Sequence, residues 1–326
     1  MIAGYYGFGN AGDELILFAL VRRFRQKNPN LSITVLSQEP DETARCFGVR
    51  ALNRWRPWTW VPSFVNASHF ILGGGGLLQE STGPWNHFYY LSLLLAAKLF
   101  RCRTEVIALG VDPMANPLNR VWTRWVLNVA ADDVSVRDDP SRKALVNVGV
   151  TIPISLRPDP VFDLNVEPPL FAPSGIALAL SESRCYPDWS SKIISLCERL
   201  NKELHVPLDL LVFFPEEDES LARDIAAHCP AIRQVRISTN PIDLLAWMPQ
   251  YQLVAATRFH ALVLAARSNV SFIGWGSQNK VSSLCKEREM PYINTEEKWD
   301  ENDEFRLLTS MYQSRNKSVI LETRTA

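Results

Sequence analysis

The chain has 326 residues, of which 47% are apolar and 21% charged, and its formal net charge is −1. This composition is that of an ordinary globular protein and excludes a disordered chain. The balanced charge lacks the basic excess that dominates nucleic-acid binding, so no nucleic-acid partner is expected. Because single cores usually stop growing near ~250 residues, we expect two domains.

The sequence also bears on the compartment. Met1 runs directly into an apolar strand, so we expect no signal peptide. The longest apolar run, residues 88–100, is too short to span a bilayer and contains Lys98. The six cysteines are scattered without C-x-x-C spacing, which predicts reduced thiols and no zinc or redox site of that type. We therefore expect a cytoplasmic protein.

Short apolar runs alternate with helical stretches in chain order. The first half predicts a helix from Asp13 to Lys27 and strands within residues 2–6, 31–37, 69–74, 104–111 and 133–138. After five prolines in residues 158–173, the pattern resumes with strands within residues 175–181, 207–214, 251–256 and 270–275. Such alternation predicts parallel sheets with right-handed crossovers. We therefore predict an α/β fold of two doubly wound, Rossmann-like domains facing a central cleft. They comprise residues 1–157 and 174–326, joined by a linker at 158–173, with a helical tail from about Lys298 that packs on either domain.

The opening stretch GYYGFGNAGDE, residues 4–14, carries the G-x-G-x-x-G spacing of a dinucleotide-binding turn. A cofactor pyrophosphate needs the free N–H groups and the positive dipole end of the following helix. Asp13 and Glu14 occupy the first turn of that helix, where their carboxylates satisfy the dipole and repel phosphate, which disfavours a dinucleotide cofactor. Two interpretations of Asp13 stay open. It is either a helix cap or, flanked by Asn10, a carboxylate that accepts a proton from a sugar hydroxyl.

A second glycine stretch, ILGGGGLLQ, follows a strand that is expected to end at Leu72. Its four glycines are Gly73, Gly74, Gly75 and Gly76. Four consecutive glycines lose much chain entropy on folding, which makes an ordinary loop an unfavourable use of them. Such a run suits a loop where a ligand or another domain approaches the backbone closely, or a nest of N–H donors for an anion.

Cationic side chains follow neighbouring strands of the second half. Arg258 and His260 lie where the strand in YQLVAATRFHALVLAA gives way to a helix, and Lys280 follows the next strand. A lone histidine is often a structural group, but beside these two cations His260 suits a pocket for a small, multiply charged anion. A helix N-terminus lowers a histidine pKa and a bound dianion raises it, which favours a proton donor active near neutral pH.

Two further arginines follow strands. Arg137, in VSVRDDPS, either pairs with Asp138 or Asp139 or binds the same anion from the first domain. Arg184 lies in the loop after GIALALS and is a weaker candidate of the same kind.

The stretch NRWRPWTWVPSF interleaves Trp55, Trp58 and Trp60 with two arginines. Interfacial tryptophan and basic residues suit contact with a membrane surface or stacking on a sugar. Burial of the tryptophans in the core is the alternative.

Taken together, the stretches GYYGFGNAGDE, ILGGGGLLQ, VSVRDDPS, RPDPVFDL and TRFHALVLAA, followed by Lys280, resemble the polysaccharide pyruvyl transferase family in content and order. The chain is most similar to the bacterial branch that pyruvylates cell-wall polysaccharide for anchoring surface proteins. This resemblance implies a GT-B-like fold, phosphoenolpyruvate as donor, and an N-acetylmannosamine-type sugar on a lipid-linked acceptor as substrate. It also implies a 4,6-linked pyruvate ketal as product and peripheral contact with the membrane surface.

The resemblance assigns roles to the candidate residues. It implies that His260 protonates the methylene carbon of the donor, while Arg137, Arg258 and Lys280 hold its carboxylate and phosphate. Asp13, with Asn10 and the four glycines, then orients the acceptor on the first domain and takes its proton. The scheme needs no metal or organic cofactor, and the sequence offers no clustered metal site. The chain departs from relatives just before Lys280, where Ser277-Gln278-Asn279 replaces a Tyr-Asp-Pro-like run.

Other functions stay open at this stage. A glycosyltransferase of the same architecture would consume a nucleotide sugar, and a dinucleotide-dependent oxidoreductase would use the opening glycines. A non-catalytic carbohydrate-binding relative would bind the acceptor without turnover.

Overall fold

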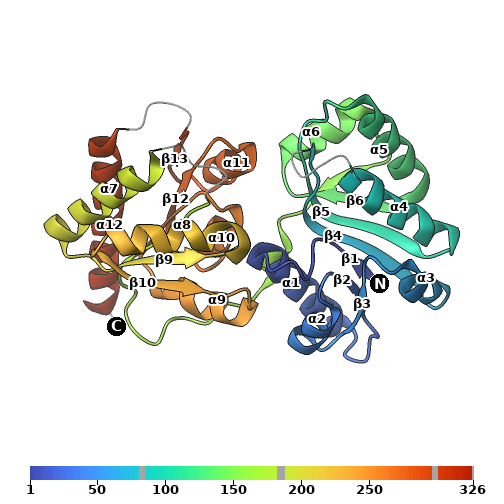
Figure 1. Cartoon of the computed structure of the whole chain (residues 1–326), viewed down its shortest axis with the longest axis horizontal. Coiled ribbons are helices and arrows are strands. Elements are labelled where there is room, and N and C mark those ends of the chain that lie inside the picture. The colour runs from blue at the N-terminus through green and yellow to red at the C-terminus, as the bar shows by residue number, and fades with distance from the viewer. Residues whose placement is uncertain (81–84, 182–187, 296–299, 325–326) are drawn as a thin grey trace. The chain divides into compact units, whose positions relative to one another are not determined.

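The computed structural model describes residues 1–80, 85–181, 188–295 and 300–324 of the chain (Figure 1). The chain divides into two compact units, Met1–Leu164 and Asn165–Ala326. The boundary between them falls inside the proline-rich segment 158–173. Each unit is built on one parallel β-sheet with helices in the connections, so the fold is the α/β, doubly wound, Rossmann-like one that the alternation of strands and helices predicts.

The sheet of the first unit has seven parallel strands in the order β3-β2-β1-β4-β5-β6-β7. Their bounds are β1 Ile2–Ala3, β2 Thr34–Ser37, β3 Arg50–Asn53, β4 His69–Leu78, β5 Arg103–Val111, β6 Asp133–Val136 and β7 Ile154–Leu156. The chain leaves β1 in one direction toward β3 and returns to β4 on the other side of β1. Ligands of such sheets bind beyond the carboxyl ends of the strands at this switch point, where residues 4–10 lie.

The helices of the first unit begin and end where local chemistry predicts. They are α1 Ala11–Lys27, α2 Pro40–Phe47, α3 Pro57–Val65, α4 Trp85–Leu99, α5 Pro117–Ala130 and α6 Asp139–Val148, followed by a 3₁₀ turn, η2 Pro160–Asp163. Asn116 and Asp138 cap α5 and α6 by accepting backbone N–H groups, and proline stands in the first turn of both helices. Gly149 ends α6 with a φ of 91°, a left-handed conformation that residues with a side chain rarely adopt.

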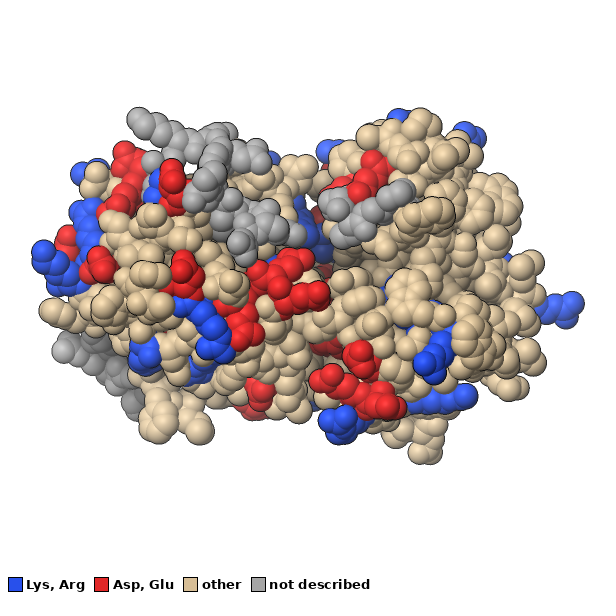
Figure 2. Space-filling model, in the orientation of Figure 1, with Lys and Arg blue, Asp and Glu red and all other residues tan. Residues whose placement is uncertain are grey.

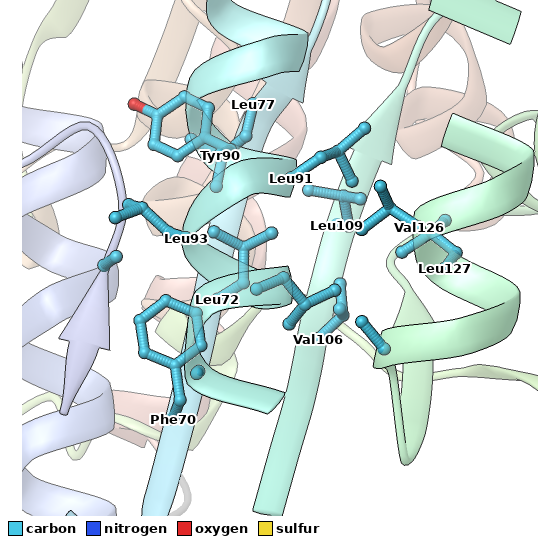
Figure 3. Packing of buried hydrophobic residues seen from close by; sticks show 14 of the residues in the cluster. Phe70, Leu72, Leu77, Tyr90, Leu91, Leu93, Val106, Leu109, Val126 and Leu127 are labelled. Atoms are coloured by element: carbon cyan, nitrogen blue, oxygen red, sulfur yellow. The ribbon is translucent and has the colours of Figure 1, made fainter. Parts of the chain in front are cut away.

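The core of the first unit joins β4 and β5 to the helices α4 and α5. In Figure 3, Leu91 of α4 lies near Leu109 of β5 and Val126 of α5, and Phe70 and Leu72 of β4 belong to the same cluster. Tyr90 is fully buried in the same cluster, but its hydroxyl points away from the other labelled side chains. Burying such side chains is the main stabilising contribution to an α/β layer, at roughly 1.5–3 kcal/mol for each large apolar group.

The second unit repeats the architecture with six parallel strands in the order β10-β9-β8-β11-β12-β13. The strands are β8 Ile176–Ala179, β9 Leu208–Val212, β10 Ile232–Ile237, β11 Leu253–Ala256, β12 Ser271–Trp275 and β13 Tyr292–Ile293. The helices are α7 Trp189–Leu204, α8 Pro215–His228, α9 Pro241–Trp247, α10 Phe259–Arg267, α11 Asn279–Glu287 and α12 Glu301–Arg324, with a 3₁₀ turn η4 Met248–Gln250 after α9. The switch point lies between β8 and β11.

The tail helix α12 packs on the second unit against α7. Phe305 and Leu308 enter the apolar core of that unit, and the Arg199 guanidinium of α7 lies 3.9 Å from the centroid of the Phe305 ring. Arg199 also donates a hydrogen bond of 2.8 Å to Asn302.

Two expectations about the strands are corrected. The apolar run at residues 69–74 predicts a strand ending at Leu72, but β4 continues through all four glycines to Leu78. The sequence pattern also gives no strand at β3, β7, β10 or β13, which the structure adds at or near the edges of the sheets.

Candidate active site

The glycine turn after β1 leads into α1, and Asn10 caps this helix. The Asn10 side chain accepts a hydrogen bond of 3.1 Å from the Gly12 N–H. Asp13 is the third residue of α1 and is buried, and the cap is Asn10, so the interpretation of Asp13 as the helix cap is wrong. A Cβ placed on Gly75 would lie 2.6 Å from the Asp13 Oδ1 atom. The carboxylate therefore rests directly on the backbone of β4.

The four glycines form part of a strand and not a loop. Gly73 pairs with Ile107 of β5 and Gly75 pairs with Leu109, with a register shift before Leu78. A Cβ on Gly73 would lie 2.7 Å from the Tyr6 hydroxyl, which donates to the Gly73 carbonyl at 2.8 Å, and one on Gly74 would lie 2.6 Å from Ile16. The chain that approaches these glycines closely is thus the protein's own turn and α1.

Strain is concentrated at this part of the sheet. Gly74 and Gly75 have φ values of 50° and 80°, and Ala108 of the neighbouring strand has a φ of 48°. A positive φ costs about 1–3 kcal/mol at a residue with a side chain. Ser135 holds the Ala108 position, since its hydroxyl accepts from the Ala108 N–H at 3.0 Å and donates to the Val106 carbonyl at 3.1 Å. The register of β4 and β5 shifts at these positions, and β-bulges of this kind are common beside active sites, where they redirect the chain.

Glu14 lies under the glycine turn and was not expected to contribute to a site. Its Oε1 atom accepts a hydrogen bond of 2.7 Å from the Gly7 N–H. Burial raises the pKa of Glu14 to about 8, although the Gly7 N–H acts in the opposite direction. At neutral pH this carboxyl is therefore mostly protonated. The sequence predicts that Asp13 and Glu14 both repel a phosphate by their charge. This is corrected for Glu14, whose carboxyl group accepts the Gly7 N–H of the turn and is held mainly in its neutral form.

Arg137 follows β6 and is almost wholly buried. Its guanidinium lies over the backbone of β5, because a Cβ on Gly110 would lie 2.5 Å from it. Its Nε atom lies 3.3 Å from Asp138, the residue that caps α6. The ion pair with Asp138 expected as one alternative is therefore present. Asp13 and Arg137 occupy the glycine faces of neighbouring strands, at Gly75 of β4 and Gly110 of β5.

Arg258 is the N-cap residue of α10 and is tied to the first turn of α8. Its guanidinium donates to both carboxylate oxygens of Asp218, with a Nε–Oδ2 distance of 2.8 Å, and to Glu217 at 2.7 Å. Burial raises the pKa of Asp218 despite the arginine. For Arg258, burial alone would lower the pKa, but the hydrogen bonds to the two carboxylates raise it. Its charge is thus largely neutralised within the protein, and binding of a donor anion by Arg258 stays a prediction.

His260 and Lys280 are brought together in the second unit. Each is the second residue of a helix, α10 and α11, and these helices follow the adjacent parallel strands β11 and β12. Both side chains lie near the Phe259 ring, whose centroid is 5.3 Å from that of His260 and 5.8 Å from the Lys280 Nζ. Neither helix has an acidic residue in its first turn, so the positive end of each helix dipole favours an anion there.

The remaining candidates divide as follows. Arg184 lies outside the described residues. Trp60 is buried in the core, whereas Trp55 and Trp58 are exposed, so the two interpretations of the tryptophan stretch apply to different residues. Sequence reasoning gave no role to Arg54, which the structure buries among aromatic rings. The only signal for it was its place within the tryptophan stretch.

A cavity of about 690 Å³ lies at the opposite, amino edge of the first sheet. Met1, Lys27, Arg50, His69 and Glu105 are among its lining residues, and none of the predicted site residues is. Over the described ranges, no group of three or more His, Cys, Asp and Glu side chains is arranged to hold a metal ion. Within the same ranges, no helix has the length and apolar character needed to cross a bilayer.

Comparisons with known proteins agree with this geometry. Solved structures with the same fold include UDP-GlcNAc 2-epimerase from Neisseria meningitidis bound to UDP-GlcNAc, with a TM-score of 0.60, 12% identity, and coverage of 97% of this chain and 93% of that one. The UDP-GlcNAc 2-epimerase from Methanocaldococcus jannaschii has a TM-score of 0.62 and 9% identity, with coverage of 95% of this chain and 91% of that one. MurG from Acinetobacter baumannii has a TM-score of 0.51 and 11% identity, with coverage of 95% of this chain and 90% of that one. Identities this low show the fold alone, which is GT-B-like.

The family is shown by a different comparison. No curated protein matched the chain. The family model described as polysaccharide pyruvyl transferase matches residues 10–279, from the cap of α1 to the residue before Lys280. Because this match spans most of its length, the chain belongs to the polysaccharide pyruvyl transferase family.

Proposed function

We propose that the protein transfers the pyruvyl group of phosphoenolpyruvate to an N-acetylmannosamine-type sugar of a lipid-linked cell-wall polysaccharide precursor, forming a 4,6-pyruvate ketal. This activity would belong to the branch of the family that prepares cell-wall polysaccharide for anchoring surface proteins. The reaction uses no metal or organic cofactor, since phosphoenolpyruvate is itself the activated substrate. The match to the family over residues 10–279 supports the reaction class.

The donor chemistry is assigned to the second unit. Lys280 and the N-termini of α10 and α11 bind the carboxylate and phosphate of the donor, and Arg258 holds the start of α10 in place. His260 gives a proton to the methylene carbon, which becomes a methyl group and leaves the central carbon electrophilic. One sugar hydroxyl attacks that carbon, phosphate leaves with its electron pair, and the second hydroxyl closes the ketal. Of the two hydroxyl protons, one replaces the proton that His260 gave and one leaves with phosphate.

The acceptor is assigned to the first unit. Asp13 takes the proton of the attacking hydroxyl, and its place over Gly75 fixes its position. Asn10 and the glycines of β4 contribute to this position by setting where α1 begins and how closely it approaches the strand. Arg137 is retained as a further anion ligand.

The observation that carries the donor assignment is the placement of His260 and Lys280 around Phe259. The test is phosphate release from phosphoenolpyruvate with a panel of N-acetylhexosamine acceptors. Lys280→Met should raise the KM for phosphoenolpyruvate, and His260→Asn should abolish turnover while leaving acceptor binding intact. Lys286→Met, on the exposed end of the same helix, and His228→Asn, on the exposed end of α8, are the matched controls. Consumption of a nucleotide sugar in place of phosphoenolpyruvate would instead identify a glycosyltransferase.

The lipid-linked acceptor places part of the first unit at an anionic membrane surface, and α5 is the helix proposed to contact it. Its exposed side chains Leu118, Val121, Trp125 and Val129 follow one helical face. The helices α4 and α5 contain three basic residues and no acidic one, and the surface over them carries few charged side chains in Figure 2. An apolar face with tryptophan and a basic rim suits the headgroup region of a bilayer.

A further inference from the structure

Arg54 is a buried cation surrounded by aromatic rings. It follows β3 at the carboxyl edge of the first sheet, and only 3% of its surface is exposed. Its Cζ atom lies 4.5 Å from the ring centroid of Tyr89, 4.9 Å from that of Phe8 and 5.0 Å from that of Trp55. We call these four residues the Arg54 cluster.

No acidic side chain pairs with Arg54 among the described residues. Its Nη1 atom donates to the Gly4 carbonyl at 3.1 Å and its Nη2 atom to the Tyr90 hydroxyl at 3.2 Å, while Nε has no hydrogen-bond partner within the same ranges. A buried guanidinium without a carboxylate relies on π faces and neutral oxygens for its stabilisation. Such an arrangement fixes the orientation of every ring that faces it.

The ring of Trp55 is exposed but held in place. Its exposed fraction is 56%, yet its Nε1 donates a hydrogen bond of 2.6 Å to the Gln38 side chain and its backbone N–H donates to Asn53 at 2.9 Å. A tryptophan that serves the core would be buried, and one without a role would be free to change rotamer. An indole that is both exposed and fixed offers a preorganised apolar face to a ligand.

A second aromatic face lies beside it. Phe8 stacks on Tyr5 with a centroid distance of 4.1 Å and an interplanar angle of 5°. Both rings belong to the glycine turn that ends at Asn10, the N-cap of α1, and Asp13 lies in the first turn of that helix. Phe8 and Trp55 flank the same guanidinium, whose Nη2 donates to the Tyr90 hydroxyl, and the charge of Asp13 acts on that hydroxyl by raising its pKa.

We propose that the Arg54 cluster binds the acceptor saccharide, with the C–H face of a pyranose ring stacked on Trp55, while Phe8, held between Tyr5 and Arg54, helps to fix the guanidinium. Sugars present apolar C–H faces and polar edges, and the Gln38 side chain lies at the edge of the indole, where it can meet a polar edge. Arg54 is a positioning residue, which acts by holding the rings. The inference rests on the proposed function, whose acceptor it locates on the carboxyl edges of β1 and β3.

The test compares Trp55→Ala and Trp55→Phe with Trp58→Ala in the full chain. Trp58 is a matched control because it lies three residues away on α3, is 72% exposed and makes no ring contact in the described structure. Saturation-transfer NMR with the methyl glycoside of N-acetylmannosamine measures saccharide binding without the donor. We expect Trp55→Ala to weaken binding by about tenfold or more and to raise the acceptor KM equally, with the phosphoenolpyruvate KM unchanged. Trp55→Phe should recover part of the affinity, and Trp58→Ala should match the parent.

The outcomes separate this inference from the proposed function. Saccharide binding that depends on Trp55, in a protein that releases no phosphate from phosphoenolpyruvate, supports the inference and refutes the proposed function. A folded Trp55→Ala variant that binds the glycoside as the parent does overturns the inference, as does a parent that binds no glycoside at all. Equal effects of Trp55→Ala on the KM of donor and acceptor would also overturn it.

Discussion

Replacing Glu14 by glutamine should stabilise the protein, and increasingly so as the pH rises. The amide retains the oxygen that accepts from the Gly7 N–H at 2.7 Å but has no proton to lose. Burial raises the pKa of Glu14 from 4.5 to about 8 in the folded chain, so over that range the unfolded chain releases a proton that the folded chain retains. In the parent, Glu14 therefore lowers the free energy of unfolding progressively as the pH rises from 4.5 to about 8, and its effect levels off at higher pH.

The size of the effect follows from the two pKa values. Their difference of about 3.5 corresponds to about 5 kcal/mol, of which about 3 kcal/mol is present at pH 7. Urea unfolding, followed by tryptophan fluorescence at pH 5 to 9, should show the advantage of Glu14→Gln growing over this range. Glu167→Gln, at an exposed position that does not contribute to the pKa of Glu14, is the control and should show a constant difference.

Selective ¹³C labelling of glutamate gives a second measurement. One carboxyl resonance of the folded parent should titrate near pH 8 and should be missing from the Glu14→Gln spectrum. The reasoning is refuted if the stability difference between the parent and Glu14→Gln is the same at pH 5 and pH 9.

Three further predictions concern other features of the molecule. Gly75→Ala should lower the free energy of unfolding by about 1–3 kcal/mol and also reduce turnover, because its φ is 80° and the added Cβ meets the Asp13 carboxylate. The control Gly48→Ala, at a φ of 62° with no atom closer than 3.5 Å to the added Cβ, should lose stability alone. Full turnover by Gly75→Ala would contradict this. Arg258→Met should lower the free energy of unfolding, measured with heat or urea, by about 3–5 kcal/mol, because it leaves the buried Asp218 without its cation. Adding Asp218→Asn should restore part of that loss. If it restores none, the ion pair does not stabilise the protein as proposed. Val121→Glu should reduce sedimentation with phosphatidylglycerol vesicles and leave turnover of a lipid-free acceptor unchanged; a parent that ignores the vesicles, or dimerises through α5, would refute the membrane contact.

The strands that could be predicted from the sequence are the central ones. β8 and β11 are buried throughout and wholly apolar, and β5 and β9 are mostly buried and apolar apart from residues 103–105 and Asp209. The strands that were missed, such as β3 and β10, lie at the edges and are half-buried, which leaves a mixed pattern without a clear period. The glycines of β4 have no side chains to form a pattern, and their strand conformation depends on pairing with β5.

The site could be predicted only in part for a related reason. Polar residues at the ends of buried strands mark one edge of a parallel sheet, which is why His260 and Lys280 could be grouped from the sequence. The pairing of Arg258 with Asp218 joins residues 40 positions apart, and no local pattern encodes it. The pKa of Glu14 depends on its burial beneath a turn, and the Arg54 cluster joins residues from three separate segments. Neither feature could be predicted without the folded structure.

The glycine-lined stretch of β4 has a mechanical consequence. Ile16 and Asp13 of α1 meet the strand backbone without an intervening layer of side chains. Because the strand contributes no side chains here, the Ile16 side chain and the Asp13 carboxylate pack directly on its backbone, and this close contact leaves little room for adjustment. A shift of the strand would reach the carboxylate nearly undiminished.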